Sequence, residues 1–180
     1  MSLAHNRLSG LKMNYWLVSD THFNHARMRE SRGRFGDWQG NLWSGLYTIP
    51  EADILIHLGD ICIGNEDSIN RQLTLTPAKK KILVRGNHDE MPDSWYYGLG
   101  WDFVCDGLEL VFQKQRVWLS HRPQPPMNHF VRNVHGHTHG NEHRLDEYAA
   151  FYKRGYHLDI SPELVGFDPQ RLDTLMEGST

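Results

Sequence analysis

The sequence predicts an α/β fold whose strands carry polar side chains at their carboxyl ends. In the first half, short apolar runs alternate with segments of helical spacing, the order expected of right-handed strand–helix–strand units. The second half has short apolar runs separated by polar or glycine-containing turns, which predict a mostly antiparallel sheet. Five apolar runs end in Asp, Asn or His. We therefore expect these ends to meet at one site.

Three strands and two helices are expected in the first half. The strands are residues 15–19, 53–58 and 79–85, each a short run dominated by apolar side chains. The helices are residues 39–49, where apolar side chains recur at helical spacing before Pro50, and residues 65–75, which begin at Asn65 or Asp67 and end before Pro77.

The second half is expected to open with a short aromatic-rich helix at residues 94–99. Residues 103–105, 109–112 and 117–119 should form an antiparallel meander, followed by strands at 133–135 and 155–160. A closing helix is expected at residues 169–176, capped by Asp168.

Length and composition indicate one domain at residues 13–180, with residues 1–12 as a disordered arm or an expression remnant. The net charge of −3 argues against a surface built throughout for nucleic acid, so no stable nucleic-acid complex is expected. No apolar run approaches the roughly 18 residues of a membrane span. The sequence has two cysteines, Cys62 and Cys105, which do not form a spaced pair, and this predicts a reduced, cytoplasmic protein. The oligomeric state is left open.

Twelve histidines are unusual in a chain of 180 residues, and several of them stand at the expected strand ends. Imidazole and carboxylate donors together suit first-row divalent ions better than magnesium or calcium alone. Seven donors are too many for a single ion that must also hold a substrate, so two ions are expected. These donors are Asp20, His22, Asp60, Asn87, His121, His137 and His139. Glycines at 59, 86 and 136 should let the backbone turn sharply and approach an ion.

Two neighbouring features are open to more than one interpretation. His57 lies inside a predicted strand, so it is expected to be a hydrogen-bonded core residue and not a ligand. The loop after the first strand continues through Asn24 and His25 into four arginines. A solvated charged face and a phosphate-binding surface are about equally expected there. The candidate substrate-binding residues are Asn24, His25, Arg27, Arg29, Arg32 and Arg34.

Five sequence blocks, in order, resemble the signature of the calcineurin-like metallophosphoesterase superfamily, in a small single-domain form of bacterial or phage type. The blocks are Asp20-Thr21-His22, Gly59-Asp60, Gly86-Asn87-His88-Asp89, Ser120-His121 and Gly136-His137-Thr138-His139. The resemblance implies a four-layer αββα sandwich with two mixed central sheets flanked by helices. It also implies that Asp60 bridges two ions, one held by Asp20, His22 and His139 and the other by Asn87, His121 and His137.

The chemistry expected of such a site is hydrolysis of a phosphoester by in-line attack of a metal-bridging hydroxide. Manganese is the first expectation for the two divalent ions, with iron, nickel, cobalt or zinc as alternatives. His88 follows the ligand Asn87 and is the candidate acid for the leaving group. Asp89 either orients the ring of His88 or only stabilises the turn.

A small-molecule or nucleotide phosphodiester is the favoured substrate. Protein phosphatases of the superfamily resemble Gly-Asp-x-His-Gly in the first block, whereas this chain has Ser19-Asp20-Thr21-His22-Phe23. A short-oligonucleotide nuclease is a further alternative, although nothing after His139 resembles an added DNA-binding domain. A non-catalytic binding module is least favoured, because all seven donors are present.

Overall fold

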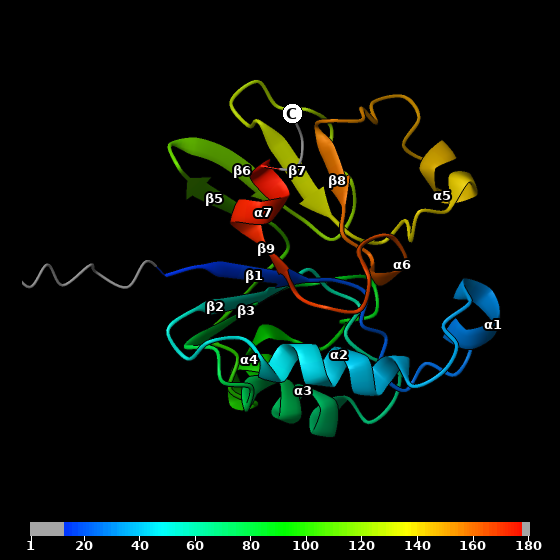
Figure 1. The fold of residues 1–180 in the computed structure, drawn as a ribbon, viewed down its shortest axis with the longest axis vertical. Coiled ribbons are helices and arrows are strands. Elements are labelled where there is room, and N and C mark those ends of the chain that lie inside the picture. Colours follow the sequence, from blue (N-terminus) through cyan, green and yellow to red (C-terminus); the bar gives the residue numbers. More distant parts are fainter. Residues whose placement is uncertain (1–12, 178–180) are drawn as a thin grey trace, which may run out of the picture.

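Two β-sheets packed face to face form the centre of the computed structural model, which describes residues 13–177 (Figure 1). The first sheet has the order β4-β3-β2-β1-β9 and the second the order β5-β6-β7-β8. Both sheets are mixed, as the resemblance of the five sequence blocks implied. The strands are β1 (Tyr15–Val18), β2 (Ile54–His57), β3 (Lys80–Val84), β4 (Phe103–Cys105), β5 (Leu108–Phe112), β6 (Gln115–Leu119), β7 (Arg132–His135), β8 (His157–Asp159) and β9 (Gln170–Arg171).

Three helices cover the outer face of the first sheet: α2 (Trp38–Tyr47), α3 (Glu66–Thr74) and α4 (Asp93–Gly98) (Figure 1). Alternate residues of its strands face opposite sides of the sheet, so one strand contributes side chains to two hydrophobic cores. Leu55 of β2 packs towards the helices with Leu42 and Leu73. Ile56, its neighbour, packs towards the second sheet with Val134. The three helices expected before residue 100 and the first three strands are therefore confirmed, within one or two residues at their ends.

The second sheet differs from the mostly antiparallel meander that was predicted. Only β5 and β6 pair in antiparallel fashion, whereas β7 is parallel to both β6 and β8. The strand β4 belongs to the first sheet, where it extends the parallel pairing of β3. Residues 120–131 connect β6 to the parallel strand β7 and contain no helix. The sequence of this proline-rich loop gives no local signal that the two strands are parallel.

The end of the chain also differs from the prediction. Gln170 and Arg171 form β9, which pairs in antiparallel fashion with Leu17 and Trp16 of β1. The last helix, α7 (Leu172–Glu177), therefore begins three residues later than expected, and Asp168 does not precede it directly. The pairing of β9 with an open sheet edge outweighs the local helical pattern.

The remaining helices are short: α1 (Met28–Arg32), α5 (Glu142–Asp146) and α6 (Pro162–Val165). Aromatic side chains from loops pack over the outer face of the second sheet. Phe130 lies on Trp118 with ring centroids 5.4 Å apart, and Tyr152 stacks on His157 at 4.5 Å. The predicted arm at residues 1–12 lies outside the part of the chain described. Within residues 13–177, no helix is long and apolar enough to cross a bilayer.

Candidate metal centre

The seven predicted donors come together where strands of both sheets end. Backbone hydrogen bonds join the loops that carry them: His22 N donates to Asp60 O at 3.0 Å, and Gly136 N donates to His121 O at 3.0 Å. The amide of His137 donates to Asp20 Oδ2 at 2.9 Å, which links the second sheet to the first. The strand-end prediction therefore places these residues correctly.

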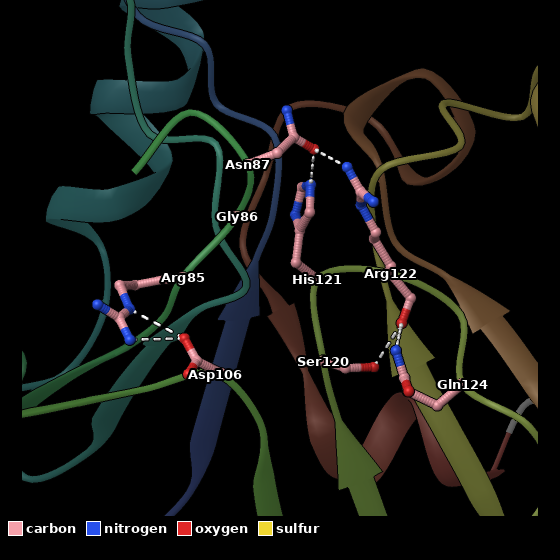
Figure 2. Close-up of a pocket in the computed structure, with 8 residues that line it drawn as sticks. All are labelled: Arg85, Gly86, Asn87, Asp106, Ser120, His121, Arg122 and Gln124. Carbon is pink, nitrogen blue, oxygen red and sulfur yellow. Dashed lines mark hydrogen bonds and ion pairs between the residues drawn. The ribbon is translucent and has the colours of Figure 1, made fainter. Parts of the chain in front are cut away.

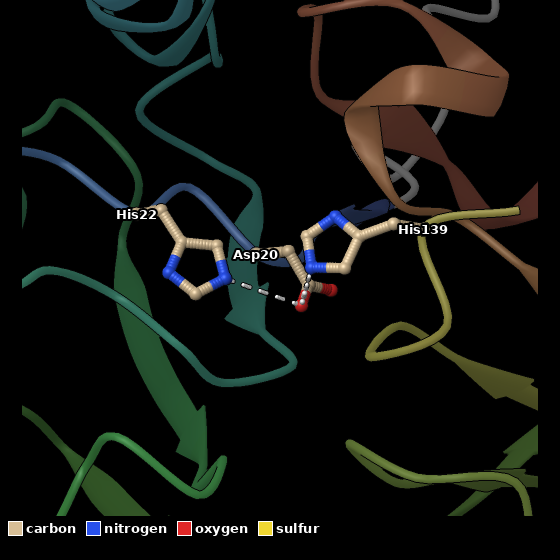
Figure 3. A group of neighbouring side chains, drawn as sticks. All are labelled: Asp20, His22 and His139. Atoms are coloured by element: carbon tan, nitrogen blue, oxygen red, sulfur yellow. Dashed lines mark ion pairs between the residues drawn. The ribbon is translucent and has the colours of Figure 1, made fainter. Parts of the chain in front are cut away.

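The first cluster consists of Asp20, His22 and His139 (Figure 3). His139 Nε2 lies 3.3 Å from Asp20 Oδ1, and His22 Nε2 lies 3.8 Å from the same oxygen. Asp20 is fully buried, and in the described part of the chain its Oδ1 has no hydrogen-bond partner, whereas Oδ2 accepts from Ser19 Oγ and His137 N. A buried carboxylate oxygen left in this way is costly unless a cation is present. Burial accordingly raises the pKa of Asp20 in the metal-free chain.

The ring of His139 is held in the first cluster by Glu163. Its Nδ1 lies 2.9 Å from Glu163 Oε2, and hydrogen bonds from His139 and Arg34 outweigh burial to lower the pKa of Glu163 to about 2. An ionised carboxylate only accepts, so Nδ1 donates to Glu163, and in the neutral ring Nε2 presents a lone pair. That lone pair faces Asp20 Oδ1, and a cation between the two atoms satisfies both.

The second cluster consists of Asn87, His121 and His137. His121 Nε2 lies 3.2 Å from Asn87 Oδ1 and 3.1 Å from His137 Nδ1. Its Nδ1 lies 2.8 Å from the carbonyl oxygen of Leu58, so Nδ1 donates to that oxygen and Nε2 is the nitrogen that faces the other donors. Burial opposes a charged His121, yet the hydrogen bond to Asp60 raises the pKa of its imidazole to about 9. The donor set therefore attracts positive charge.

Asp60 lies between the two clusters. Its Oδ2 is 3.6 Å from His22 Nε2 and 3.4 Å from His121 Nε2. Ligand atoms bound at about 2.1 Å to one ion lie roughly 3.0–3.4 Å apart, depending on its geometry. The separations in both clusters are close to that range, and the donors are carboxylate, imidazole and amide. The residues present therefore fit two divalent ions that share Asp60.

The backbone at the candidate ligands is unusual. Positive φ angles are rare in residues other than glycine, and strained residues of this kind gather at functional sites. Five of the seven donors have positive φ. They are Asp20 (49°), His22 (46°), Asp60 (57°), His137 (68°) and His139 (52°).

The glycines beside the ligands make room for carboxylates. A Cβ on Gly136 would overlap Ser19 Oγ and Asp20 Oδ2, and one on Gly86 would overlap Asp60 Oδ1. From the sequence, we expected these glycines to let the backbone come close to an ion. In the structure, the groups approached are the carboxylates of Asp20 and Asp60.

A family model described as calcineurin-like phosphoesterase matches residues 13–159, a range that contains all seven donors. The chain belongs to the calcineurin-like phosphoesterase family. An uncharacterized protein of Methanocaldococcus jannaschii is 25% identical over 172 residues, covering 90% of this chain and 89% of its own length.

Two solved structures share the fold of this calcineurin-like phosphoesterase. A protein of unknown function from Aquifex aeolicus has a TM-score of 0.72 at 22% identity, covering 92% of this chain and 98% of its own. A structure described as a novel archaeal phosphodiesterase has a TM-score of 0.51 at 16% identity, covering 83% of each chain. The metallophosphoesterase fold predicted from the five blocks is thereby confirmed.

His88 lies beside the candidate metal centre and is the most exposed of its histidines. Its side chain is 38% exposed, and Nε2 lies 3.9 Å from Asp60 Oδ2. Its ring is also 5.4 Å from the ring of His22. Asp89 accepts hydrogen bonds from the backbone amides of Gly86, Asp60 and Ile61, using both carboxylate oxygens. That pattern supports the turn-stabilising alternative for Asp89 over a role in orienting His88.

The predicted substrate loop lies in several different environments. His25 is half-buried, and its Nδ1 lies 3.4 Å from Nδ1 of the ligand His22. Asn24 is directed elsewhere, because its amide donates to the carbonyl oxygen of Gly64.

His57 is buried, with Nε2 2.9 Å from Thr21 Oγ1 and Nδ1 accepting from Gly59 N. The core role predicted for His57 is confirmed.

The four arginines separate by burial. Arg34 is 2% exposed and donates to the carbonyl oxygens of Asp20 and Thr21, so its guanidinium is not available to a substrate. Arg27 and Arg29 are exposed, and Arg29 lies over the ring of Phe35. Arg32 is half-buried, and burial followed by the nearby Arg144 guanidinium lowers its pKa. Of the four, Arg32 is thus the one that is only partly buried and has a second cation nearby.

Three residues near the centre were missed in the sequence. Glu163 of α6 contacts both His139 and Arg34. Arg144 of α5 donates to the carbonyl oxygen of His137, and Arg122 Nη2 lies 3.4 Å from Asn87 Oδ1. Only Arg122 had a local signal, since it directly follows the ligand His121. Nothing in the neighbouring sequence distinguishes Glu163 from other surface acids.

Proposed function

We propose that this phosphoesterase hydrolyses phosphodiesters with two divalent transition-metal ions, manganese being the first candidate. The observation that carries the proposal is the buried Oδ1 of Asp20, which has no hydrogen-bond partner among residues 13–177 and faces His139 Nε2. The first cluster would hold one ion, the second cluster the other, and Asp60 would contact both. When bound, such a pair supplies an activated water and positive charge for the phosphoryl oxygens.

The protein's own groups then have distinct tasks. Glu163 holds Nδ1 of His139 and the carbonyl oxygen of Leu58 holds Nδ1 of His121, so in both rings Nε2 is the nitrogen directed at the candidate ion sites. His88 is exposed enough to reach a bound substrate and lies beside Asp60. In this proposal His88 gives its proton to the departing alcohol. A second role deserves a test, because His88, His22 and Asp60 also have ligand atoms within 4.8 Å of one another.

The preference for a diester is supported by the pairing of two of the arginines near the centre with carboxylates. A diester carries one negative charge and a monoester up to two, so a monoesterase benefits from additional cations. Arg34 is enclosed, and Arg85 is paired with both Asp93 and Asp106. Phe23 replaces the glycine of the protein-phosphatase pattern and is fully buried, stacked on Trp43 at 4.2 Å. At that position of the loop, the side chain therefore packs in the hydrophobic core.

A panel assay tests the proposal. Metal-free protein is reloaded with manganese, iron, nickel, cobalt or zinc and assayed on bis-p-nitrophenyl phosphate, p-nitrophenyl phosphate, cyclic nucleotides, a short oligonucleotide and a phosphopeptide. We expect the highest kcat/KM on the diester with manganese. Preference for the phosphopeptide or the oligonucleotide would support the alternatives of a protein phosphatase or a nuclease. Tight ligand binding without hydrolysis under any metal would indicate a binding module.

A further inference from the structure

A cavity of about 250 Å³ opens beside the second cluster (Figure 2), and its lining residues do not include the arginines at 27–34 that the sequence singled out. Asn87 and His121 form the end nearest the candidate ions. Arg85 and Asp106 form one wall, while Arg122 and Gln124 lie on the opposite side (Figure 2). The cavity is smaller than the roughly 300–1,000 Å³ typical of sites for drug-sized ligands, so it suits one small group.

Charge is distributed unevenly across this cavity. Within residues 13–177, Arg122 has no ion pair, and its guanidinium contacts Asn87 Oδ1 at 3.4 Å. Arg85 is neutralised, because Nη2 lies 2.7 Å from Asp106 Oδ1 and Nη1 lies 2.9 Å from Asp93 Oδ1. The end beside the metal centre is therefore positive, whereas the far wall carries the 81% exposed carboxylate of Asp106.

The backbone that carries Arg122 is held firmly. Ser120 Oγ donates to the carbonyl oxygen of Arg122 at 2.8 Å, and Pro123 restricts the next φ angle. Gln124 N donates to the buried Asn133 Oδ1 at 2.8 Å. The guanidinium of Arg122 is nevertheless exposed. A fixed base with a free cationic end is suited to contacting an anion.

These observations identify complementary chemistry for the two ends. A phosphoryl group matches the end formed by Arg122 and the candidate metal ligands. A second phosphate at the far wall would be repelled by Asp106, but sugar hydroxyls can donate to that carboxylate and accept from the amide of Gln124. We propose that this cavity binds the sugar of a sugar phosphodiester, with Arg122 on the phosphoryl oxygens and Asp106 and Gln124 on the hydroxyls. The proposal rests on the phosphodiesterase function above and adds the class of alcohol.

Binding of ribose 5-phosphate and cyclopentylmethyl phosphate, measured by calorimetry with metal-free and manganese-loaded protein, tests the subsite without relying on turnover. The two probes share a phosphate and a five-membered ring and differ in hydroxyls and ring oxygen. We expect ribose 5-phosphate to bind about tenfold more tightly, a preference that Asp106→Asn and Gln124→Ala should reduce towards one. Arg122→Ala should weaken both probes. Arg71→Ala, on the exposed face of α3, is the matched control and should change neither affinity.

Equal affinities in the parent, or unchanged affinities in Arg122→Ala, would overturn the subsite. Turnover of the p-nitrophenyl diesters of the same two alcohols separates the two proposals. If both diesters are hydrolysed with the same kcat/KM, the subsite fails while the phosphodiesterase function stands. If the sugar phosphate is preferred in binding and neither diester is hydrolysed with any metal, the function fails while the subsite stands.

Discussion

Arg34 and Glu163 form an ion pair beneath the first cluster, with Arg34 Nε 2.8 Å from Glu163 Oε1. The two residues lie 129 positions apart in the chain. Through this pair, the helix α6 is connected to the loop after β1, because Arg34 also donates to the carbonyl oxygens of Asp20 and Thr21. Trp38 and Phe167 flank the guanidinium at 5.0 and 5.7 Å. Glu163 in turn holds His139 through Nδ1.

Replacing Glu163 by Gln should weaken metal binding at the first cluster. The amide keeps the shape of the side chain but loses the charge that fixes the tautomer of His139, and loss of such an outer partner typically lowers affinity about 10–100-fold. Titration of metal-free protein with manganese against a fluorescent chelator measures this change. Glu51→Gln, at an exposed position far along the chain from the ligands, is the control. Parent-like affinity in Glu163→Gln would remove the positioning role.

Arg34 and Arg32 should respond differently to substitution. Arg34→Met leaves Glu163 without its partner in a largely buried site, so we expect a loss of stability of about 3–5 kcal/mol. Arg32→Ala removes a half-buried cation that forms no ion pair with a carboxylate of residues 13–177, so its folding should be little changed while KM rises. Urea unfolding and steady-state kinetics on both variants distinguish these effects. A stable Arg34→Met with raised KM would restore Arg34 as a substrate-binding residue.

The different environments of these arginines show where sequence reasoning stops. Four arginines at residues 27–34 look equivalent in the sequence, and only the distant Glu163 decides which one is buried. The ligands were predictable for the opposite reason, since every one of them follows one of five strands directly and the ends of parallel strands meet at one edge. The parallel pairing of β7 was missed because it depends on how residues 120–131 cross the sheet.

His57 should make the metal-free protein less stable in acid. Burial, with a smaller effect of the nearby His121, lowers the pKa of His57 to about 3, against 6.5 for an ordinary histidine. Between these values the unfolded chain binds the extra proton, so the free energy of unfolding falls as pH falls from 6.5 towards 3. His57→Gln should flatten this dependence by roughly 1 kcal/mol per pH unit. Urea unfolding at pH 4, 5, 6 and 7 measures it, and parallel curves for parent and variant would contradict the assignment.

His88→Ala should separate proton delivery from metal binding. If His88 protonates the departing alcohol, the variant keeps its metals but loses about 10²–10⁴-fold in kcat on alkyl diesters. A p-nitrophenolate leaving group needs little protonation at pH 7, so aryl diesters should be affected less. Equal slowing of both esters would point instead to stabilisation of charge on the phosphoryl oxygens. Loss of one metal would assign His88 to the ligand group that it forms with His22 and Asp60.

The central claim is that two ions share Asp60, and metal content under saturating manganese tests it most directly. Elemental analysis and calorimetric titration should give two ions per chain for the parent. Asp60→Asn should bind neither ion tightly, since its Oδ2 lies within 3.6 Å of both His22 Nε2 and His121 Nε2 and the substitution removes the charge that both ions share. The account predicts two manganese ions in the active parent and almost none in Asp60→Asn. Saturation at one ion per chain with full activity would contradict it.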